Sequence, residues 1–249
     1  MTATGQNRFS PAYVEAIRRG DNVPVVTWEQ FSAQFQWLQG EHAALIGPTG
    51  AGKTTLSLLL IQIRQYVTVF ATKPQDPVLR ALLKQNYKLM SEWKSYDPDL
   101  IPKRLLWPEA TKLYAAKNQQ RVFKDAFNNI YPQGGWCVYL DELWYVIHHL
   151  KLELELRTFL LQGRSMDISL LCCTQRPSRV PLEIYDQSTH LFFWRDNDEV
   201  NLRRISGLAG VSSSDIQAIV AQLPRYQCLY INTRENIMLR FTPPSGVFE

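Results

Sequence analysis

A short segment near position 50 has the residue types and the spacing that hold a phosphate chain. Gly47 is followed, after four residues, by Gly52, Lys53 and Thr54, which is the Walker A pattern. Glycines let backbone N–H groups turn toward phosphate oxygens, and the N-terminus of a following helix favours negative charge. Lys53 is expected to reach the β- and γ-phosphates of ATP, and Thr54 to ligate Mg²⁺. The predicted cradle comprises Gly47, Pro48, Thr49, Gly50, Ala51, Gly52, Lys53, Thr54 and Thr55.

A pair of acids ends a second apolar segment. In WCVYLDELW, a largely apolar run leads to Asp141 and Glu142. Asp141 is expected to hold Mg²⁺ through its water, and Glu142 to act as general base on the attacking water. A simpler alternative is that Asp141 only caps the helix that follows. The second acid favours hydrolysis over phosphate transfer to a small molecule, because a kinase of that kind needs no water-activating glutamate.

A glutamine ends a third apolar run. The run ISLLCCT leads to Gln175, which is followed by Arg176 and Pro177. If this strand neighbours the strand that ends in the acids, Gln175 lies beside Glu142, because ligands of open α/β sheets bind at the carboxyl ends of strands. An amide can accept from water and donate to phosphate at once, so we interpret Gln175 as a sensor of the γ-phosphate. The alternative is an amide that only satisfies free backbone groups.

The elements that must position these residues alternate between strand-like and helix-like segments. This alternation is typical of an α/β fold with a mainly parallel sheet covered by helices. The apolar run AALI precedes the cradle and a helical pattern follows it, which favours a nucleotide site over a chance glycine-rich turn. Strands are predicted at His42–Ile46, Tyr66–Ala71, Leu105–Trp107, Trp136–Leu140, Ile168–Cys173 and Leu191–Trp194. Helices are predicted at Lys53–Gln65, Pro77–Gln85, Thr111–Ile130, Leu152–Gln162, Glu199–Ile205 and Ser214–Leu223.

Both ends of the chain differ from this pattern. Residues 1–40 are predicted to form an arm with a short amphipathic helix near Trp28–Leu38, and residues 41–249 to form one P-loop ATPase motor domain. Near the C-terminus, Tyr226–Ile231 and Ile237–Phe241 flank the segment NTREN and predict a β-hairpin at the sheet edge. The segment LKLELEL alternates as a strand does, but its leucines also fit one helical face, and we interpret it as helix.

The composition is that of an ordinary globular protein. Of 249 residues, 45% are hydrophobic and 20% are charged. No apolar run approaches the ~18 residues of a membrane span, and the start MTATGQNRFS lacks the apolar core of a signal peptide. We therefore expect a cytoplasmic protein without a transmembrane segment. The four cysteines lack metal-ligand spacing and are expected to be reduced core thiols, and His148 and His149 are expected to be structural.

One block of the chain is distinctly basic, although the net charge of the whole chain is only +4. Residues 80–131 contain ten Lys or Arg and five Asp or Glu. Lys and Arg neutralise phosphates without reading bases, so this block is a candidate surface for double-stranded DNA. The alternative is a solvated helix face with aromatic residues in the core. The candidates are Lys88, Lys94, Lys103, Arg104, Lys112 and Lys117, together with Trp93, Tyr96, Trp107 and Tyr114.

Other classes of P-loop protein fit the sequence less well. The chain has no LSGGQ-like signature of an ABC ATPase. The segment TKPQD, Thr72–Asp76, superficially resembles the NKxD motif of a GTPase, but its aspartate comes one residue too late and follows the wrong strand. Asp76 is instead predicted to cap a helix that begins at Pro77. An AAA+ protein usually has asparagine at the place of Gln175.

The Walker A segment, VYLDE and GRSMDISLLCCTQRPSRVP together resemble the HerA/FtsK superfamily of DNA-pumping ATPases. The resemblance covers about residues 41–241 and implies a three-layer P-loop fold of the additional-strand catalytic-glutamate, RecA-like class. It also implies a homo-oligomeric ring, expected to be a hexamer, in which an arginine of one subunit completes the site of its neighbour. Arg164 is the first candidate for this finger, Arg195 in LFFWR the second and Arg176 the third.

Only about 40 residues precede the expected ATPase core. In this compact form, the chain resembles the genome-packaging ATPases of membrane-containing viruses and phages. This resemblance implies a motor that uses ATP and Mg²⁺ to move double-stranded DNA into a capsid. A capsid or membrane-vertex protein is then a further partner, and the host cytoplasm or the virion vertex is the location. A conjugation or plasmid-transfer motor is the alternative within the same class. From other classes, a morphogenesis or secretion ATPase acting on protein and a nucleotide-gated binding module with little hydrolysis remain open.

Overall fold

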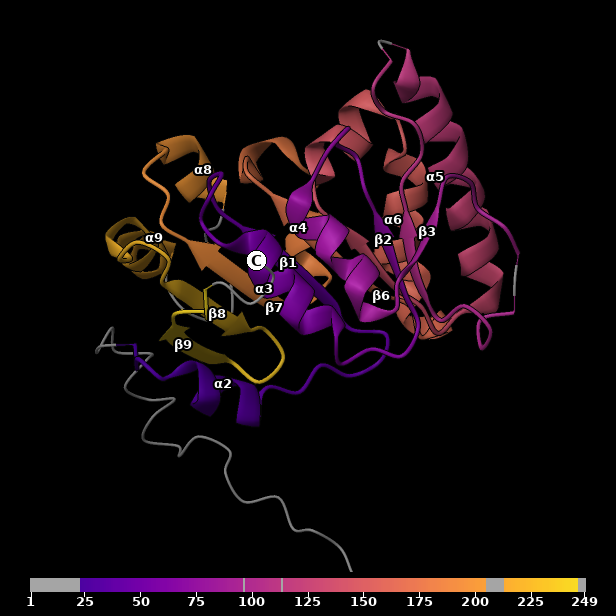
Figure 1. Cartoon of the computed structure of the whole chain (residues 1–249). Helices are drawn as coiled ribbons and strands as arrows, with labels where there is room; N and C mark the ends of the chain where they lie inside the picture. Colours follow the sequence, from indigo (N-terminus) through magenta and orange to yellow (C-terminus); the bar gives the residue numbers. More distant parts are fainter. Residues whose placement is uncertain (1–22, 96, 113, 205–212, 246–249) are drawn as a thin grey trace, which may run out of the picture.

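A nine-stranded sheet runs through the part of the chain that the computed structural model describes, which is residues 23–95, 97–112, 114–204 and 213–245 (Figure 1). The strand order is β3-β4-β2-β5-β6-β1-β7-β8-β9. The strands from β3 to β7 in this order are parallel, and β8 and β9 form an antiparallel hairpin at one edge. The bounds are β1 (His42–Ile46), β2 (Val67–Phe70), β3 (Lys88–Met90), β4 (Lys103–Leu106), β5 (Cys137–Leu140), β6 (Ser169–Thr174), β7 (Ser188–Trp194), β8 (Cys228–Asn232) and β9 (Ile237–Phe241).

Helices cover both faces of this sheet and give the predicted three layers. One face packs against α5, α6, α7 and α9, and the other against α2, α3 and α4. The bounds are α2 (Trp28–Gln34), α3 (Lys53–Ile61), α4 (Pro77–Arg80), α5 (Ala115–Gln133), α6 (Glu153–Gln162), α7 (Glu183–Asp186), α8 (Glu199–Arg204) and α9 (Ser213–Gln222). Within the described ranges, no helix combines the length and the apolar character that crossing a membrane requires.

Strand β6 separates β1 from β5. Leu45 of β1 pairs with Cys173 of β6, and Leu140 of β5 pairs with Cys172 of β6, all in parallel register. The phosphate-binding segment follows β1, and the acid pair follows β5, so the two meet the end of β6 from opposite sides. The adjacency of β5 and β6 that places Gln175 beside the acids is therefore confirmed.

Most predicted elements are present, with ends that differ by a few residues. The ambiguous segment LKLELEL lies at the start of α6, as predicted, and Asp76 caps α4 by accepting from Leu79 N at 3.1 Å. Strand β3 was not predicted, because this edge strand has only three residues and its first two are exposed. The helix predicted to begin at Thr111 begins at Ala115. The separate helix predicted at Glu199–Ile205 is α8, and its predicted last residue, Ile205, lies outside the described residues.

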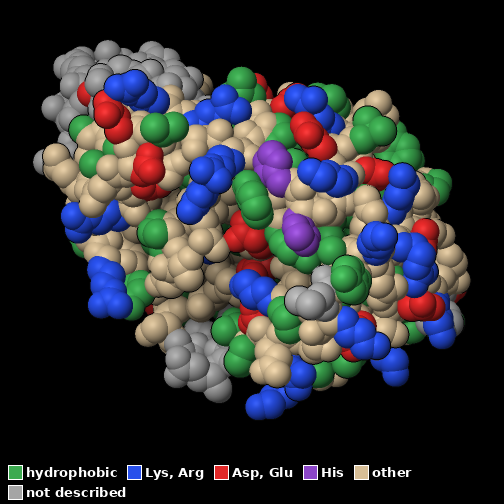
Figure 2. All heavy atoms as spheres, turned by 90° about the horizontal axis from the view of Figure 1, so that it is seen from above, with side chains coloured by type: hydrophobic (Ala, Val, Ile, Leu, Met, Phe, Trp, Pro, Cys, Tyr) green, Lys and Arg blue, Asp and Glu red, His purple; other side chains and the backbone are tan. Residues whose placement is uncertain are grey.

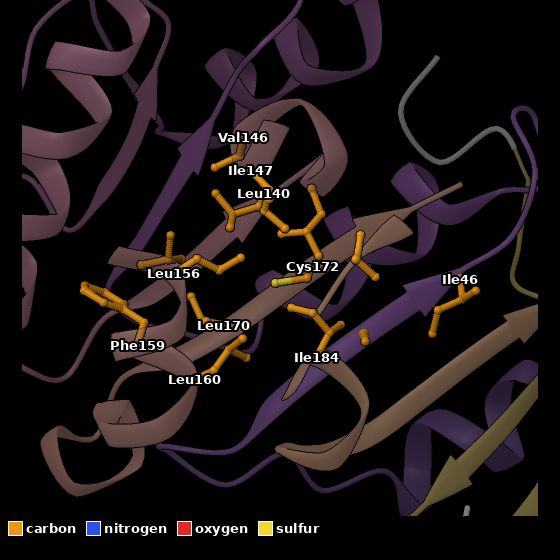
Figure 3. Close-up of a cluster of buried hydrophobic side chains, with 14 of the residues drawn as sticks. Ile46, Leu140, Val146, Ile147, Leu156, Phe159, Leu160, Leu170, Cys172 and Ile184 are labelled. Carbon is orange, nitrogen blue, oxygen red and sulfur yellow. The ribbon is translucent and has the colours of Figure 1, made fainter. Parts of the chain in front are cut away.

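The larger apolar cluster packs the sheet against α5, α6, α7 and α9, and Figure 3 shows the part of it around β5, β6, α6 and α7. Leu170 and Cys172 of β6 point into this cluster, whereas Leu171 and Cys173 belong to the cluster on the opposite face. This alternation is the period of two that a strand buried on both faces must have. All four cysteines are buried and free, as expected for core thiols. The continuous core fixes the ends of β5 and β6, where the polar residues emerge.

The N-terminal arm is joined to the hairpin. Val25 forms a β-bridge with Arg240 of β9, where Val26 N donates to Arg240 O at 2.9 Å and Arg240 N donates to Pro24 O at 2.8 Å. Helix α2 then begins with a capping box, in which the Thr27 side chain accepts from Gln30 N. From α2, Phe31 is 2% exposed and stacks on Phe241, with 4.0 Å between ring centroids. The arm thus adds a backbone pair and an aromatic anchor to the edge of the sheet.

Phe31→Ala is expected to lower the free energy of unfolding by about 3–5 kcal/mol, because it removes a buried aromatic ring and leaves a cavity. Urea unfolding followed by circular dichroism measures the change. Ser32→Ala, at the exposed neighbouring position, is the control and should change the value by less than about 0.5 kcal/mol. Equal effects of the two substitutions would show that the arm does not depend on this aromatic contact.

Candidate nucleotide-binding site

The loop between β1 and α3 makes turns and contacts that require glycine. Gly50 and Gly52 have φ of 75° and 104°, in the left-handed region. A Cβ atom at Gly47 would lie 2.8 Å from the Cβ atom of Trp194, at the end of β7, which is too close for any side chain. Helix α3 begins at Lys53, so its free N–H groups face the loop. The loop therefore has the shape of the predicted phosphate cradle.

Lys53 is folded back into this loop. Its Nζ donates to the carbonyl oxygens of Gly47 and Pro48, both at 2.8 Å, and the residue is 8% exposed. Burial lowers the pKa of Lys53, and the nearby carboxylates of Glu142 and Asp141 oppose that shift. A buried ammonium held only by neutral carbonyls gains from an anionic partner. Lys53 is thus prepared to bind a phosphate oxygen.

Three donors hold Asp141 at the end of β5. Its Oδ1 accepts from Thr54 Oγ1 at 3.0 Å and from the Tyr139 hydroxyl at 2.7 Å. Its Oδ2 accepts from Lys73 Nζ at 2.7 Å. Burial would raise the pKa of Asp141, but the Lys73 ammonium and these hydrogen bonds outweigh burial and lower it. Asp141 is therefore held as a carboxylate, in contact with the hydroxyl of Thr54.

Gln175 links the phosphate loop to the second acid. Its Nε2 donates to Glu142 Oε2 at 2.7 Å, and its Oε1 accepts from Thr49 Oγ1 at 2.6 Å. Burial and the neighbouring Asp141 carboxylate raise the pKa of Glu142. A carboxylate with a raised pKa is a better proton acceptor than an ordinary glutamate. The two adjacent acids thus have opposite pKa shifts, which suits one for binding a cation and the other for accepting a proton.

Thr54 and Asp141 fit a Mg²⁺ ion that is shared with a nucleotide. Mg²⁺ prefers oxygen ligands, keeps several waters and is commonly held by one or two protein groups together with substrate phosphates. The oxygens of Thr54 and Asp141 that contact each other lie at the start of α3, beside the cradle. Over the described ranges, no group of three or more His, Cys, Asp or Glu side chains is arranged to hold a metal by itself. The donor set therefore suits a metal that arrives with its nucleotide.

Lys73 is the candidate site residue that the sequence analysis missed. Its Nζ is ion-paired with Asp141 at 2.7 Å and with Asp76 at 3.3 Å. Lys73 follows β2, and β2 is the other neighbour of β5 in the sheet. The carboxyl ends of adjacent parallel strands converge, so the position of Lys73 after its strand was a usable signal.

A second layer of polar groups supports the end of β2. Gln119 of α5 donates to Thr72 O at 2.9 Å and accepts from the Tyr145 hydroxyl at 2.7 Å. Tyr145 begins a π-helical turn, η2 (Tyr145–His149), directly after the acid pair. Such turns occur frequently at functional sites. Gln119 gave no signal in the sequence, because one amide within an amphipathic helix does not alter the periodicity.

The three candidate arginines lie in different places. Arg195 lies beside Pro48 and Thr49, in a pocket of 580 Å³ next to the phosphate loop of its own subunit. Arg164 lies in η3 (Gly163–Met166), which precedes β6 and so lies at the amino ends of the parallel strands, whereas the phosphate loop lies at their carboxyl ends. Arg176 is exposed and shares a pocket of 390 Å³ with Glu142 and Gln175. Of the three arginines, Arg164 is the one that lies at the opposite end of the strands from the phosphate loop.

Figure 2 views the face formed by the carboxyl ends of the parallel strands. Acidic side chains lie in a hollow near the middle of this face, and Lys and Arg side chains surround it (Figure 2). The pocket lined by Glu142, Gln175 and Arg176 brings a carboxylate, an amide and a guanidinium together.

One candidate of the basic block, Arg104, does not lie on the surface. Arg104 is fully buried, and its guanidinium lies 4.5 Å and 4.6 Å from the ring centroids of Trp93 and Trp136. It also donates to Ile101 O at 3.0 Å. The prediction of Arg104 as a DNA contact was wrong, because stacking between two indoles draws it into the core. Tyr96 lies outside the described residues, and the exposed residues among the candidates named for this block are Lys88, Lys94, Lys112, Lys117 and Tyr114.

Glu142→Gln is expected to raise the melting temperature at neutral pH. The pKa of Glu142 is raised in the folded protein, so folding disfavours its charged form, and glutamine removes that cost. The folded pKa lies above the unfolded value, so the stability of the wild type falls as pH rises through this interval. The advantage of the variant should disappear below the ordinary glutamate value of 4.5.

Thermal unfolding at pH 7 and at pH 4 measures this difference, with the exposed Glu153→Gln as control. A lower melting temperature of Glu142→Gln at pH 7 would contradict the expectation, because it would mean that the hydrogen bond from Gln175 outweighs burial.

The sequence matches no protein-family model and no curated protein, but solved structures share its fold. The genome packaging NTPase B204 of Sulfolobus turreted icosahedral virus 2, in complex with ATP-gammaS, has a TM-score of 0.58 and 14% identity over 83% of this chain and 98% of that chain. VirB4 of Thermoanaerobacter pseudethanolicus has a TM-score of 0.61 and 10% identity over 84% and 90%. The type VII secretion ATPase EccC of Thermomonospora curvata has 0.54 and 14% over 85% of this chain and 26% of that longer chain. The chain thus has the P-loop fold of these proteins, as its motifs predicted.

Proposed function

We propose that this chain is an ATPase that forms a ring and moves double-stranded DNA, and that its task is to package a viral genome. The observation that carries the proposal is the bridge formed by Gln175, which joins Thr49 of the phosphate loop to the proposed base Glu142 through one amide. A phosphate that enters the loop must disturb this bridge, so the arrangement couples nucleotide occupancy to the position of the base. The fold shared with a genome packaging NTPase supports DNA as the cargo.

The chemistry follows from the partners of each side chain. Lys53 exchanges its two carbonyl acceptors for oxygens of the β- and γ-phosphates. Glu142 accepts a proton from the attacking water, which its raised pKa favours. The Gln175 oxygen that accepted from Thr49 and the Gln175 nitrogen that donated to Glu142 are then free to contact the γ-phosphate or the water. The phosphate loop and the acid pair thus act as one unit.

Thr54 and Asp141 are the residues that would hold Mg²⁺, and the ion would neutralise charge that develops on the phosphate oxygens. Lys73 is a positioning residue in this scheme. Its ammonium keeps Asp141 charged and fixes one carboxylate oxygen, which leaves the other toward Thr54. Asp76 Oδ2 also accepts from Lys73 Nζ, at 3.3 Å, so the ammonium is held by two carboxylates.

The ring is proposed as a homo-hexamer in which Arg164 reaches the nucleotide of a neighbouring subunit. The position of Arg164, exposed at the amino ends of the strands and opposite to its own loop, supports this role. Arg195 lies beside its own loop and is proposed to act within the subunit. The exposed lysines of the basic block are the proposed DNA contacts. The proposal places the ring in the host cytoplasm or at a virion vertex, with a capsid or vertex protein as partner.

A motor that acts on protein is the second candidate, and the likeness to a type VII secretion ATPase favours it. The two candidates share the ATPase site and differ in what stimulates it. Exposed lysines suit DNA as the cargo, because they can contact phosphates whatever the base sequence. A protein cargo needs no basic block. Steady-state turnover in the presence of each cargo separates them.

Duplex DNA is expected to stimulate ATP hydrolysis by the assembled wild type, and Glu142→Gln should hydrolyse at least about 100-fold more slowly while still binding ATP. Phosphate release measures turnover, and fluorescence of a labelled ATP analogue measures binding. Glu153→Gln, a glutamate on the surface of α6, is the matched control and should keep both. Full turnover in Glu142→Gln would remove the general-base role, and stimulation by protein but not by DNA would favour the second candidate.

Arg164→Ala is expected to abolish ATPase activity in a way that mixing reveals. Subunits carrying Arg164→Ala have intact phosphate loops, and subunits carrying Lys53→Ala have intact fingers. Mixed rings therefore contain interfaces at which both are intact, and these should recover part of the activity. Each variant alone should remain inactive. Mixtures that co-assemble, as shown by pull-down between differently tagged subunits, but recover nothing would exclude Arg164 as the finger.

A further inference from the structure

A pocket of 440 Å³ extends from the phosphate loop on the side away from the acid pair. It is lined by the start of α3, including Thr54 and Thr55, by Tyr226, and by Thr242, Pro243 and Pro244 after β9. Neither Glu142 nor Gln175 belongs to it. A bound nucleotide must point its γ-phosphate at Glu142 and Gln175, since the attacking water lies there. Its nucleoside must then leave the loop on the side of this pocket.

Tyr226 is held in this pocket in spite of its backbone conformation. It is the third residue of a turn in which Gln227 N donates to Pro224 O at 3.1 Å, and its φ is 65°. Glycine or asparagine is usual at such a position, because a side chain there strains the backbone. A bulky tyrosine at a glycine-type position indicates that the ring itself is needed.

The ring of Tyr226 is prepared to stack on a flat partner. The Arg225 guanidinium lies 4.7 Å from its centroid and covers one face. The residue is 46% exposed, so much of the remainder is open. Nucleobases stack on such aromatic rings whatever their edge pattern, because every base has a π-face.

The opposite wall does not distinguish one purine from another. Pro243 and Pro244 offer apolar rings, and the hydroxyls of Thr242 and Ser245 can each donate or accept. Among the described lining residues, no side chain carries an amide or a carboxylate. A site without a fixed pattern of donors and acceptors discriminates weakly between substrates that differ in such groups.

We propose that this pocket binds the nucleoside of the substrate, that Tyr226 stacks on the base, and that adenine and guanine are both accepted. The inference rests on the proposed function, because it supposes that the loop binds the triphosphate. It adds the substrate class, which is a purine nucleoside triphosphate with little choice of base.

Binding of three ligands to the full chain tests the proposal: the non-hydrolysable analogues AMPPCP and GMPPCP, and tripolyphosphate, each with Mg²⁺. Isothermal titration calorimetry gives the Kd. Tyr226→Ala is expected to weaken both analogues about 10-fold and to leave tripolyphosphate unchanged, since only the base touches the ring. Tyr226→Phe should retain the wild-type values. For the wild type, the Kd values of the two analogues should agree within about 10-fold.

Two results would overturn the inference while the proposed function stands. One is an equal effect of Tyr226→Ala on all three ligands, or on none; the other is a preference above about 100-fold for one analogue. Absence of binding of all three ligands by the wild type would instead remove the phosphate site and the proposed function with it. Leu154→Ala, at an exposed position on α6, is the control for substitution as such. Circular dichroism melting confirms that Tyr226→Ala folds.

Discussion

The spacing of strands in the sheet sets the distance between the phosphate loop and the acid pair. Adjacent strands lie about 4.8 Å apart, so the loop after β1 and the acids after β5 are separated by two spacings, about 10 Å. That gap accommodates a terminal phosphate and one water, and β6 ends in its middle. The side-chain amide of Gln175 carries both a donor and an acceptor, and it contacts both sides of this gap. Without the intervening strand, the loop and the acids would be only one strand spacing apart, about 4.8 Å.

The same geometry explains how two adjacent carboxylates acquire different properties. Asp141 receives donors from β2, α3 and its own strand, so its charge is compensated where it is buried. Glu142, one residue later, receives one amide donor and feels the charge of Asp141. A parallel sheet supplies this difference readily, because each strand end is flanked by the ends of its two neighbours. Chemical asymmetry here comes from which strands are adjacent, and much less from the residues themselves.

The sequence predicted those parts of the molecule in which a local pattern coincides with a structural role. The alternation of apolar runs and helical segments gave the layers, and the Walker A spacing gave the loop. Arg104 could not be assigned in the same way, because its role depends on contacts between segments distant in the chain. The role of Lys73 follows only once β2 and β5 are known to be neighbours in the sheet. Arg104 shows most clearly where prediction from sequence ends. A charged residue in a basic segment is predicted to lie on the surface, and only the structure shows that two indole rings enclose this one. Tyr226 depends likewise on a backbone angle that residue types do not reveal.

The pairing of the N-terminal arm with β9 has a mechanical consequence. Arg240, which exchanges backbone hydrogen bonds with the arm, is two residues before Thr242, where the proposed nucleoside pocket begins. The arm and the pocket therefore share one short, hydrogen-bonded segment of chain. A displacement of β9 would therefore move the backbone partners of Pro24 and Val26 together with the wall of the pocket that begins at Thr242.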